Sequence, residues 1–329
     1  MREAASLERL EMHLPPLRTG PDDAGKMMAA CLHMIVGETA MKKLIEVVQE
    51  AGRNCVAIGH FNIADLVLLK GVFQAARELN VPVLVGASEG EREFVGTRQL
   101  AVVVQSLREE FDFPIFLNAD HTHSLAKALE AVKAGFDSVV FDLSALPFAG
   151  NARSTRQAVE ELKSINPAVV VEGEIGDIGS GSEIHADSPS PDHALTTPEE
   201  AHQFVVETKV DTLAPAVGNS HGMRKSMVIG KKRKHLAIER IREIKSATSV
   251  PLTLHGGSGT ADEDLRGAIH AGINIVHINT ELRLAWKQGL EAGLARREDE
   301  VVPYKILPSA VAAVHDVVSA RLRLFAGQI

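Results

Sequence analysis

FLNADHTHSLAKALEAVKAGFDSVVFDLS, residues 116–144, contains two short β-rich runs separated by an amphipathic segment of helical length. The helical pattern ends at KAGFDSVV, where glycine can adopt the left-handed conformation that terminates a helix. This alternation predicts parallel strands joined by a helical crossover. The first run ends in Asp-His-Thr-His (120–123), so the unit also places a carboxylate and two imidazoles between a strand and a helix.

The same alternation of strand and helix continues along the chain from residue 55 onward. The eight strand candidates are CVAIGHFN (55–62), VPVLVGAS (81–88), PIFLNAD (114–120), SVVFDLS (138–144), AVVVEGEIG (168–176), DTLAPAVG (211–218), PLTLHGGS (251–258) and INIVHINT (273–280). Eight such units predict an α/β protein with a (β/α)₈ TIM barrel and extra helices at its C-terminus.

The pattern also predicts the domain organisation. Residues 41–329 form a single TIM-barrel catalytic domain, because the regular pattern opens at Met41. Residues 1–40 show weak periodicity and contain LPPLRTGPDDAGK. We interpret them as an N-terminal extension, either an upstream start or a mobile tail.

Composition and charge narrow the possible function classes. Of the 329 residues 45% are hydrophobic and 24% charged, which favours a globular protein with an aliphatic core. A net charge of −8 argues against nucleic-acid binding, and the basic run GKKRKH (230–235) is interpreted as a solvated loop. Two cysteines form no disulfide framework, which favours a reducing cytoplasm. The apolar runs are strand-sized and the N-terminus shows no targeting signal, so we expect no membrane association.

Polar residues recur where the predicted strands end. Enzymes on this barrel carry their chemistry at the carboxyl ends of the strands, and polar groups scattered for structural reasons would not gather there. The pattern therefore predicts a functional site built from Asn62, Ser88, Asp120, His121, Asp142, Ser144, Glu172, Glu174, His221, His255, Asn279 and Thr280.

Three of these residues predict a metal centre. His121, His221 and His255 come from units three, six and seven, and three imidazoles with an open fourth position are a common catalytic arrangement for zinc. His123 either competes with His121 or faces the start of the following helix.

The acids predict a cationic neighbourhood. Glu172 and Glu174 lie two apart on one strand and share a face, as do Asp142 and Ser144, and we expect that face to line the barrel. Buried carboxylates need a cation, a partner or hydrogen bonds. A purely hydrogen-bonded acidic cluster is the alternative.

The Gly-rich segment LHGGSGTADEDL predicts a phosphate site. It places Gly256, Gly257 and Ser258 before a helix, and INTEL does the same after the eighth strand, so backbone N–H groups at helix starts can bind phosphate. The segment contains no Arg or Lys, so binding would depend on backbone donors. The long loops 177–196 and 219–234 are expected to be lids or binding elements, with disorder as the alternative.

Six motifs in order resemble the class II, metal-dependent fructose-bisphosphate aldolases and their tagatose-bisphosphate relatives, from about residue 41 to the end. They are ADH, VVFDLSALPF, VEGEIGDIGSGSE, AVGNSHGM, LHGGSG and INTELR. The resemblance implies a lyase of carbohydrate metabolism that acts in glycolysis in the cytoplasm as a homodimer or homotetramer. It also implies a reversible cleavage of a ketose 1,6-bisphosphate, by default the fructose compound, to dihydroxyacetone phosphate and an aldehyde.

The resemblance also assigns residues. His121, His221 and His255 would bind Zn²⁺, Asp120 would be the acid/base, and Asp142 and Glu174 match an alternative metal position. The positions around the ketose phosphate, often with a monovalent cation (K⁺ or Na⁺), would be Gly222, Gly256, Ser258, Asn279 and Thr280, while Asn62 and Ser88 would approach the dihydroxyacetone portion. Zinc as a Lewis acid would stabilise the enediolate that carbon–carbon cleavage leaves.

The chain departs from the family pattern in two places. The second proton-carrying carboxylate is displaced in GSGSEIH, which makes Glu183 the candidate, with Asp177 and Glu174 as fallbacks. His277 stands where many relatives carry Asn, so either the phosphate surroundings differ or it is a hydrogen-bonded interior histidine.

Other functions stay open at this point. The substrate can instead be tagatose 1,6-bisphosphate or a deoxy-ketose phosphate. A phosphate-binding isomerase or a lysine-dependent aldolase also fits a barrel, but the eight strand runs contain no lysine. A barrel that binds a sugar phosphate without catalysis is the third reading.

Overall fold

The computed structural model describes residues 41–179, 181–187, 194–296 and 298–328, and the chain from Lys42 onward forms one compact unit. Residues 1–40, interpreted above as an extension, lie outside the described residues. Among those described, eight parallel strands close into a barrel in the order β1-β10-β9-β7-β5-β4-β3-β2. These strands are β1 (Ile58–Asn62), β2 (Val83–Ala87), β3 (Ile115–Thr122), β4 (Ser138–Phe141), β5 (Val170–Ile175), β7 (Thr212–Pro215), β9 (Leu252–Leu254) and β10 (Ile273–Ile278).

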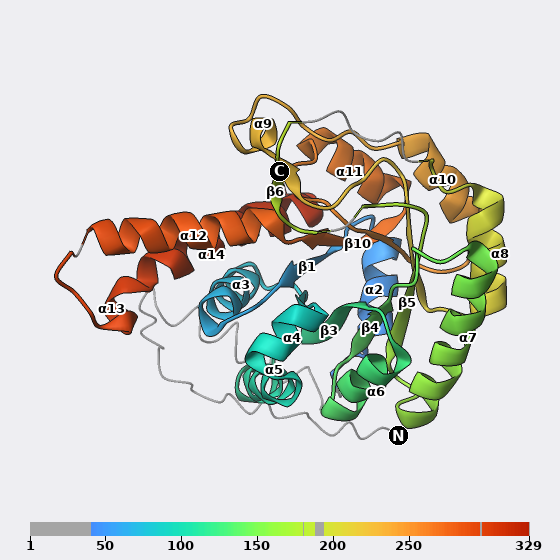
Figure 1. Cartoon of the computed structure of the whole chain (residues 1–329), viewed down its shortest axis with the longest axis horizontal. Helices are drawn as coiled ribbons and strands as arrows, with labels where there is room; N and C mark the ends of the chain where they lie inside the picture. The colour runs from blue at the N-terminus through green and yellow to red at the C-terminus, as the bar shows by residue number, and fades with distance from the viewer. Residues whose placement is uncertain (1–40, 180, 188–193, 297, 329) are drawn as a thin grey trace, which may run out of the picture. The chain divides into compact units, whose positions relative to one another are not determined.

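All eight predicted strands occur in the predicted order, which confirms the TIM barrel. Helices follow the strands and cover the outside of the closed sheet (Figure 1). The first helix, α2 (Leu44–Arg53), precedes β1, and the later helices are α3 (Leu66–Leu79), α4 (Glu89–Val95), α5 (Thr97–Phe111), α6 (Leu125–Ala134), α7 (Phe148–Ile165), α8 (Pro198–Thr208), α9 (Lys225–Val228), α10 (Ile238–Ala247), α11 (Asp262–Ala271), α12 (Thr280–Ala295), α13 (Pro303–Ile306) and α14 (Pro308–Phe325).

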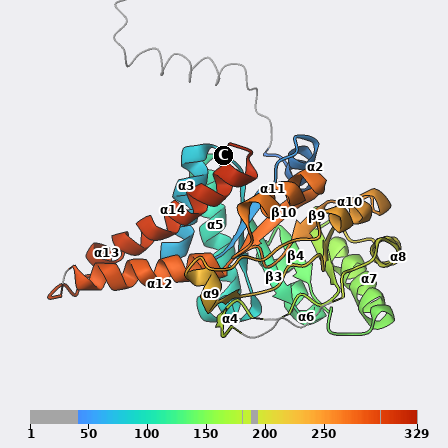
Figure 2. The ribbon, with the colours of Figure 1, turned by 90° about the horizontal axis from the view of Figure 1, so that it is seen from above.

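The extra C-terminal helices are also present. Helices α12 and α14 lie side by side, and α14 also packs against α3 (Figures 1 and 2). Gly289 permits this approach, since a Cβ on it would lie 2.6 Å from the Cα of Ala310. Within the described residues, no helix combines the length and the apolar character that a membrane span requires.

The inside of the barrel is divided into an apolar end and a polar end. At the amino ends of the strands, side chains from five strands pack against α2, which closes that end of the barrel. This apolar cluster contains Leu44, Val47, Val48, Ala51, Ile58, Leu84, Phe116, Val170 and Ile275.

Two-residue steps along the same strands lead to the polar end. In β1 Ile58 is followed by His60 and Asn62, and in β5 Val170 is followed by Glu172 and Glu174, because alternate residues of a strand face the same side. All four polar side chains are buried. The strands thus deliver imidazoles, amides and carboxylates to one end of an otherwise apolar interior.

The two long loops after β5 and β7 are joined by a short ladder. Strand β6 (Ile184–His185) pairs in parallel with β8 (Met223–Arg224) outside the barrel. Since β6 follows Glu183 and β8 follows His221 and Gly222, the ladder holds these two loops together at the polar end.

Candidate active site

A bulge in β3 brings two consecutive side chains to the same site. The pairing of β3 with β4 shifts by one residue between Ala119 and Thr122, and His121 has a φ of +34°. Positive φ is uncommon for residues other than glycine, and bulges with such strain recur at functional sites. The bulge explains how Asp120 and His121 both face the polar end, which an unbroken strand would prevent.

A buried guanidinium holds this bulge in place. Arg92, on α4, donates through Nη1 to the carbonyl oxygens of Ala87 (2.5 Å) and Asp120 (3.3 Å), and through Nη2 to the hydroxyl of Thr122 (3.0 Å). Its side chain spans the end of β2 and the irregular part of β3. Two hydrogen bonds from this side chain therefore hold the residues on either side of His121, and the third ties them to the end of β2.

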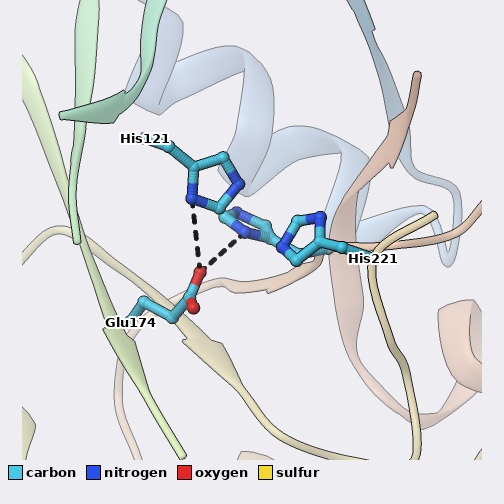
Figure 3. A group of neighbouring side chains, drawn as sticks. His121, Glu174 and His221 are labelled. Carbon is cyan, nitrogen blue, oxygen red and sulfur yellow. Dashed lines mark ion pairs between the residues drawn. The ribbon is translucent and has the colours of Figure 1, made fainter. Parts of the chain in front are cut away.

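The three predicted imidazoles converge. One ring nitrogen each of His121, His221 and His255 and a carboxylate oxygen of Glu174 lie within 4.8 Å of one another. The ring centroids of His121 lie 4.7 Å from His221 and 4.9 Å from His255. Figure 3 shows His121 and His221 turned toward the Glu174 carboxylate, and the four groups come from four different strands or their following loops.

The bonding of these atoms fits a divalent metal ion. Nδ1 of His255 and Oε2 of Glu174 form an ion pair at 2.9 Å, and neither atom makes a hydrogen bond within the described residues. In the same part of the chain Nε2 of His221 is buried without a partner. Buried polar atoms rarely lack hydrogen bonds, and a bound cation would satisfy these three.

The charges around the group favour a cation as well. Burial lowers the pKa of His221 well below its usual value, with help from His121 and His255, so this imidazole is neutral and able to bind metal. Burial opposes protonation of His121 and His255 too. Neighbouring carboxylates nevertheless raise the pKa of His121 to about 9 and that of His255 well above normal. A bound divalent ion would provide the positive charge that these carboxylates otherwise obtain from protonated His121 and His255.

Asp142 and Glu172 orient two of the imidazoles. The Asp142 carboxylate lies 2.9 Å from Nδ1 of His121, and the Glu172 carboxylate lies 2.8 Å from Nε2 of His255. Glu172 also accepts hydrogen bonds from the hydroxyls of Thr212 and Thr253. Carboxylates that bond the second nitrogen of a metal-binding imidazole fix its tautomer and its ring orientation.

One oxygen of Asp120 is held by a hydrogen bond, while the other, Oδ1, lies 3.5 Å from Nδ1 of His277. Asn62 donates through Nδ2 to Oδ2 of Asp120 (2.9 Å) and to Glu91 (2.9 Å). Within the described chain Oδ1 of Asp120 has no hydrogen-bond partner. Burial alone would raise the pKa of Asp120, but His121, His277 and His60 hold it well below its usual range, so the group is a carboxylate.

A second group of metal-type side chains lies beside the first. Nitrogens of His60 and His277 and an oxygen of Asp120 also lie within 4.8 Å of one another. However, the two rings stack at 3.5 Å with an angle of 9° between their planes. In-plane lone pairs of stacked parallel rings do not point at one ion, so we interpret this pair as a packed, neutral contact. Burial lowers the pKa of both rings.

The pocket above Asp120 contains most of the predicted phosphate residues. Its lining includes Asn62, Asp120, His121, Ser182, His221, Gly222, Gly256, Ser258, His277, Asn279 and Thr280. The Ser258 hydroxyl accepts hydrogen bonds from the backbone N–H groups of Asn279 (3.2 Å) and Glu281 (3.3 Å) at the start of α12. In the described chain Oδ1 of Asn279 is buried without a partner, so it is available to a ligand.

Two residues predicted for substrate binding, Ser88 and Gly257, lie outside this pocket. The Ser88 hydroxyl caps α4 and donates to Glu91 (2.9 Å), and Gly257 donates its N–H to the carbonyl of His277 (3.1 Å). Neither is among the lining residues above. The His123 side chain is 58% exposed, and its Nδ1 lies 2.9 Å from the backbone carbonyl oxygen of Asp142.

The proposed proton carrier Glu183 is exposed, although its neighbour Ser182 lines the pocket. Its carbonyl accepts a hydrogen bond from the N–H of Met223 at the β6–β8 ladder (2.9 Å). The fallback Asp177 accepts from the N–H of Gly179 (2.8 Å), and Glu174 belongs to the metal group. The Glu183 carboxylate is thus attached to a segment that lies beside the pocket.

Several residues of the site were missed by the sequence analysis. Glu91 joins Asn62 to Arg283, whose Nη2 lies 2.7 Å from Oε1 of Glu91. The spacing of Ser88 and Glu91 is that of a capping box and could have indicated this residue. His60 and Asn118, which contact each other at 3.2 Å, gave no signal beyond the strand alternation.

One interpretation from the sequence was wrong in part. The basic run 230–235 was interpreted as a solvated loop, and Lys231, Lys232 and Arg233 are indeed exposed. Lys234, however, is 7% exposed and reaches back into the site. The apolar stem of a lysine can be buried while its ammonium finds acceptors, which composition alone does not reveal.

Comparison with known proteins agrees with this geometry. The sequence profile described as fructose-bisphosphate aldolase class-II matches residues 42–328. The chain is 33% identical over 302 residues to a fructose-bisphosphate aldolase from Thermus caldophilus, covering 85% of this chain and 96% of the relative. It is 30% identical over 280 residues to a sulfofructosephosphate aldolase from Alkalicoccus urumqiensis, covering 85% and 94%.

Among solved structures, the crystal structure of the YdjI aldolase from Escherichia coli K12 is similar with a TM-score of 0.73 and 28% identity. The match covers 86% of this chain and 96% of that one. The sequence profile extends across nearly all of the described barrel, including each strand end that contributes to the metal group. The chain therefore belongs to the class II fructose-bisphosphate aldolase family, whose members are metal-dependent lyases of carbohydrate metabolism.

Proposed function

We propose that the protein cleaves a ketose 1,6-bisphosphate reversibly to dihydroxyacetone phosphate and an aldehyde, with fructose 1,6-bisphosphate as the default substrate and Zn²⁺ as the metal. The observation that carries the proposal is the convergence of His121, His221, His255 and Glu174 beside Oδ1 of Asp120, which makes no hydrogen bond within the described residues. Three imidazoles and one exchangeable position are a donor set typical of catalytic zinc.

The metal, when bound, supplies Lewis-acid stabilisation for the oxygen charge that develops as the carbon–carbon bond breaks. Asp120 takes the proton from the C4 hydroxyl through Oδ1, while Asn62 keeps Oδ2 occupied and so fixes the direction of the carboxylate. Its depressed pKa keeps it in the carboxylate form that a general base requires.

The phosphate next to the ketone would lie against Gly222, Gly256 and Ser258, with Asn279 and Thr280 at the start of α12. Positive φ angles at Gly222 (+72°) and Gly256 (+62°) suit glycine and leave the backbone accessible to a ligand. The positive end of the α12 dipole favours an anion there.

Return of a proton to the substrate carbon needs a second acid, and we propose Glu183. Because the neighbouring Ser182 lines the pocket, a small movement of the segment before β6 would bring the Glu183 carboxylate inward. Glu183→Gln should therefore slow proton exchange at that carbon of dihydroxyacetone phosphate more than it weakens zinc binding.

The test of the main proposal is metal removal and replacement. Chelation should abolish cleavage and Zn²⁺ should restore it, while His255→Ala should lower kcat/KM by at least about 10³-fold with loss of bound zinc. His270→Ala is the matched control, because His270 is exposed on α11 and bonds only a backbone carbonyl in the described contacts. Full cleavage by the chelated protein would refute the proposal.

The choice of ketose requires a substrate panel. Fructose and tagatose 1,6-bisphosphates differ only in the configuration at C4 and release the same aldehyde, whereas a deoxy-ketose phosphate and a sulfofructose phosphate differ in the aldehyde that they release. The sulfofructosephosphate relative justifies the last of these. A barrel that binds these compounds without cleaving any of them, with zinc bound, would be a binding protein.

We further propose a cytoplasmic homodimer or homotetramer acting in glycolysis. An apolar groove of about 570 Å³ between α3, α13 and α14, with exposed Leu66 and Tyr304 at its edge, supports self-association. Light scattering with size-exclusion chromatography measures the assembly. A monomer at micromolar concentration would contradict it.

A further inference from the structure

Lys234 has an unusual set of partners. Its Nζ donates hydrogen bonds to the backbone carbonyl oxygens of Ser220 (2.5 Å), Gly222 (2.6 Å) and Gly256 (3.0 Å). An ammonium group has three hydrogens, so all of its donors are used. These three carbonyls converge on one positive charge that is almost fully buried.

The acceptors belong to the two loops that carry metal-binding residues. Ser220 and Gly222 stand on either side of His221, and Gly256 follows His255. The loops approach so closely that a Cβ on Gly256 would lie 2.3 Å from the Ser220 oxygen. Lys234 therefore lies where the His221 loop and the His255 loop meet.

The backbone of Lys234 is fixed to the same region. Its N–H donates to the carbonyl of Gly259 (2.9 Å), and its own carbonyl accepts from Ala261 (3.2 Å). The side chain is thus anchored at its base by the loop after β9 and at its tip by both loops. An anchored ammonium cannot leave the carbonyls without breaking these contacts.

Carbonyl dipoles balance the charge of Lys234. Among the described residues no carboxylate forms an ion pair with Nζ. Glu281 attracts it from a greater distance and is itself paired with Arg321 (2.8 Å). Burial lowers the pKa of Lys234 to about 8, helped by Arg224 and opposed by Glu281, so the amine is mostly protonated at neutral pH.

We propose that Lys234 acts as a built-in monovalent cation, which positions the His221 and His255 loops and provides a fixed positive charge behind the phosphate end of the pocket. Gly222 and Gly256, whose carbonyls it binds, also line that pocket. The protein then needs no K⁺ or Na⁺ at this place. The role in phosphate binding rests on the proposed function, whereas the cation role rests on the carbonyl geometry alone.

The geometry leads to a specific rescue experiment. Potassium and ammonium ions have nearly the same radius, and both bind groups of carbonyl oxygens. Lys234→Met keeps most of the apolar stem and removes the charge, which leaves three unsatisfied carbonyls that either ion can occupy. Tetramethylammonium is too large to do so. Lys232→Met is the matched control, because Lys232 is exposed in the same run.

Cleavage is measured in the zinc-saturated proteins in tetramethylammonium, potassium and ammonium chlorides at equal ionic strength. Wild type and Lys232→Met should differ by less than about twofold between salts, while Lys234→Met should lose at least about tenfold in tetramethylammonium and regain most of it in potassium or ammonium. The loss should be mainly in KM for the phosphorylated ketose.

A second measurement separates this role from a merely structural one and does not depend on turnover. Potassium should raise the Tm of Lys234→Met by several degrees over tetramethylammonium, and should leave the wild-type Tm unchanged, because only the variant has an ion site to fill. If no ketose is cleaved by the wild type, the proposed function fails, and this Tm comparison still tests the cation role.

Three results would overturn the proposal. They are activation of the wild type more than about tenfold by potassium, a folded Lys234→Met whose cleavage no ion restores, and equal potassium effects on the Tm of variant and wild type. If Lys234→Met folds in none of the salts, the wild-type salt comparison decides the question, with salt-independent cleavage supporting the proposal.

Discussion

The two ends of the barrel interior are built by the same strands and have opposite character. At the amino ends, Ile58, Phe116 and Val170 pack on α2 and contact other apolar side chains. Four residues further along the same strands lie Asn62, Asp120 and Glu174, which are buried and polar or charged. Burial of apolar surface stabilises the fold, whereas burial of carboxylates is unfavourable unless partners or a cation compensate. The apolar end of the interior therefore stabilises the barrel, whereas the polar end carries the candidate active site.

This division predicts that changes at the two ends have different consequences. A change at the polar end should alter catalysis or metal binding with little loss of fold, and a change at the apolar end should do the reverse. The expected effects below run from the largest to the smallest.

The largest effect is expected at Asp120. Asp120→Asn keeps the hydrogen-bonding shape but cannot accept a proton, so kcat should fall by about 10²–10⁴-fold. Bound zinc should stay near the wild-type level, because Asp120 lies outside the group around Glu174. Steady-state kinetics and metal analysis measure the two quantities. Asp299→Asn, on an exposed residue, is the control, and a fully active Asp120→Asn would contradict the role.

The apolar end should respond in stability. Phe116→Ala removes a ring that is 3% exposed and packs under α2, so the free energy of unfolding should fall by about 3–5 kcal/mol. Denaturant unfolding measures this change, and kcat of the folded fraction should change little. Phe94→Ala, at an 80% exposed position, should cost less than about 0.5 kcal/mol. A Phe116→Ala protein with normal stability and a large loss of kcat would contradict the division between a stabilising apolar end and a functional polar end.

Glu172 lies on β5 between Val170 of the apolar end and Glu174 of the metal group. Glu172→Gln keeps the volume but weakens the contact that orients His255, so zinc affinity should fall by about 10–100-fold. Competition with a chromogenic chelator measures this affinity. Glu160→Gln, at an exposed position of α7, should leave it unchanged. An unaltered affinity in Glu172→Gln would show that this carboxylate serves packing alone.

The smallest effect concerns the pH dependence of stability. Lys234 loses its proton near pH 8 in the folded chain and near 10.5 in the unfolded one, so between these values the unfolded state binds more protons. The free energy of unfolding of the wild type should therefore rise with pH relative to Lys234→Met, by about 1.5 kcal/mol between pH 8 and 9.5. Denaturant unfolding at both pH values measures the difference, and a constant difference would contradict a buried, protonated Lys234.

The strands and the polar residues at their carboxyl ends were predictable from the sequence because local patterns encode them. Apolar runs of strand length, glycines after helices and polar residues at strand ends all follow from periods of two and 3.6 residues. The three histidines could be predicted as a set because barrel geometry brings equivalent strand ends together.

Other features depend on tertiary contacts that no local pattern contains. The bulge that turns Asp120 and His121 to one side depends on Arg92, on another helix. The burial of Lys234 depends on carbonyls of loops far away in the sequence. The exposed position of Glu183 depends on the pairing of β6 with β8, two-residue strands too short to leave a signal.

The pairing of β6 with β8 has a mechanical consequence. Ile184 and His185 pair with Met223 and Arg224, so the segment that follows Glu183 cannot swing outward without pulling on the backbone next to His221. Gly222 makes this connection tight, since a Cβ there would lie 2.3 Å from Nε2 of His185. If entry of a sugar phosphate displaced this segment, the backbone beside His221 would move with it, and we would then expect a bound metal to exchange most readily in that displaced state.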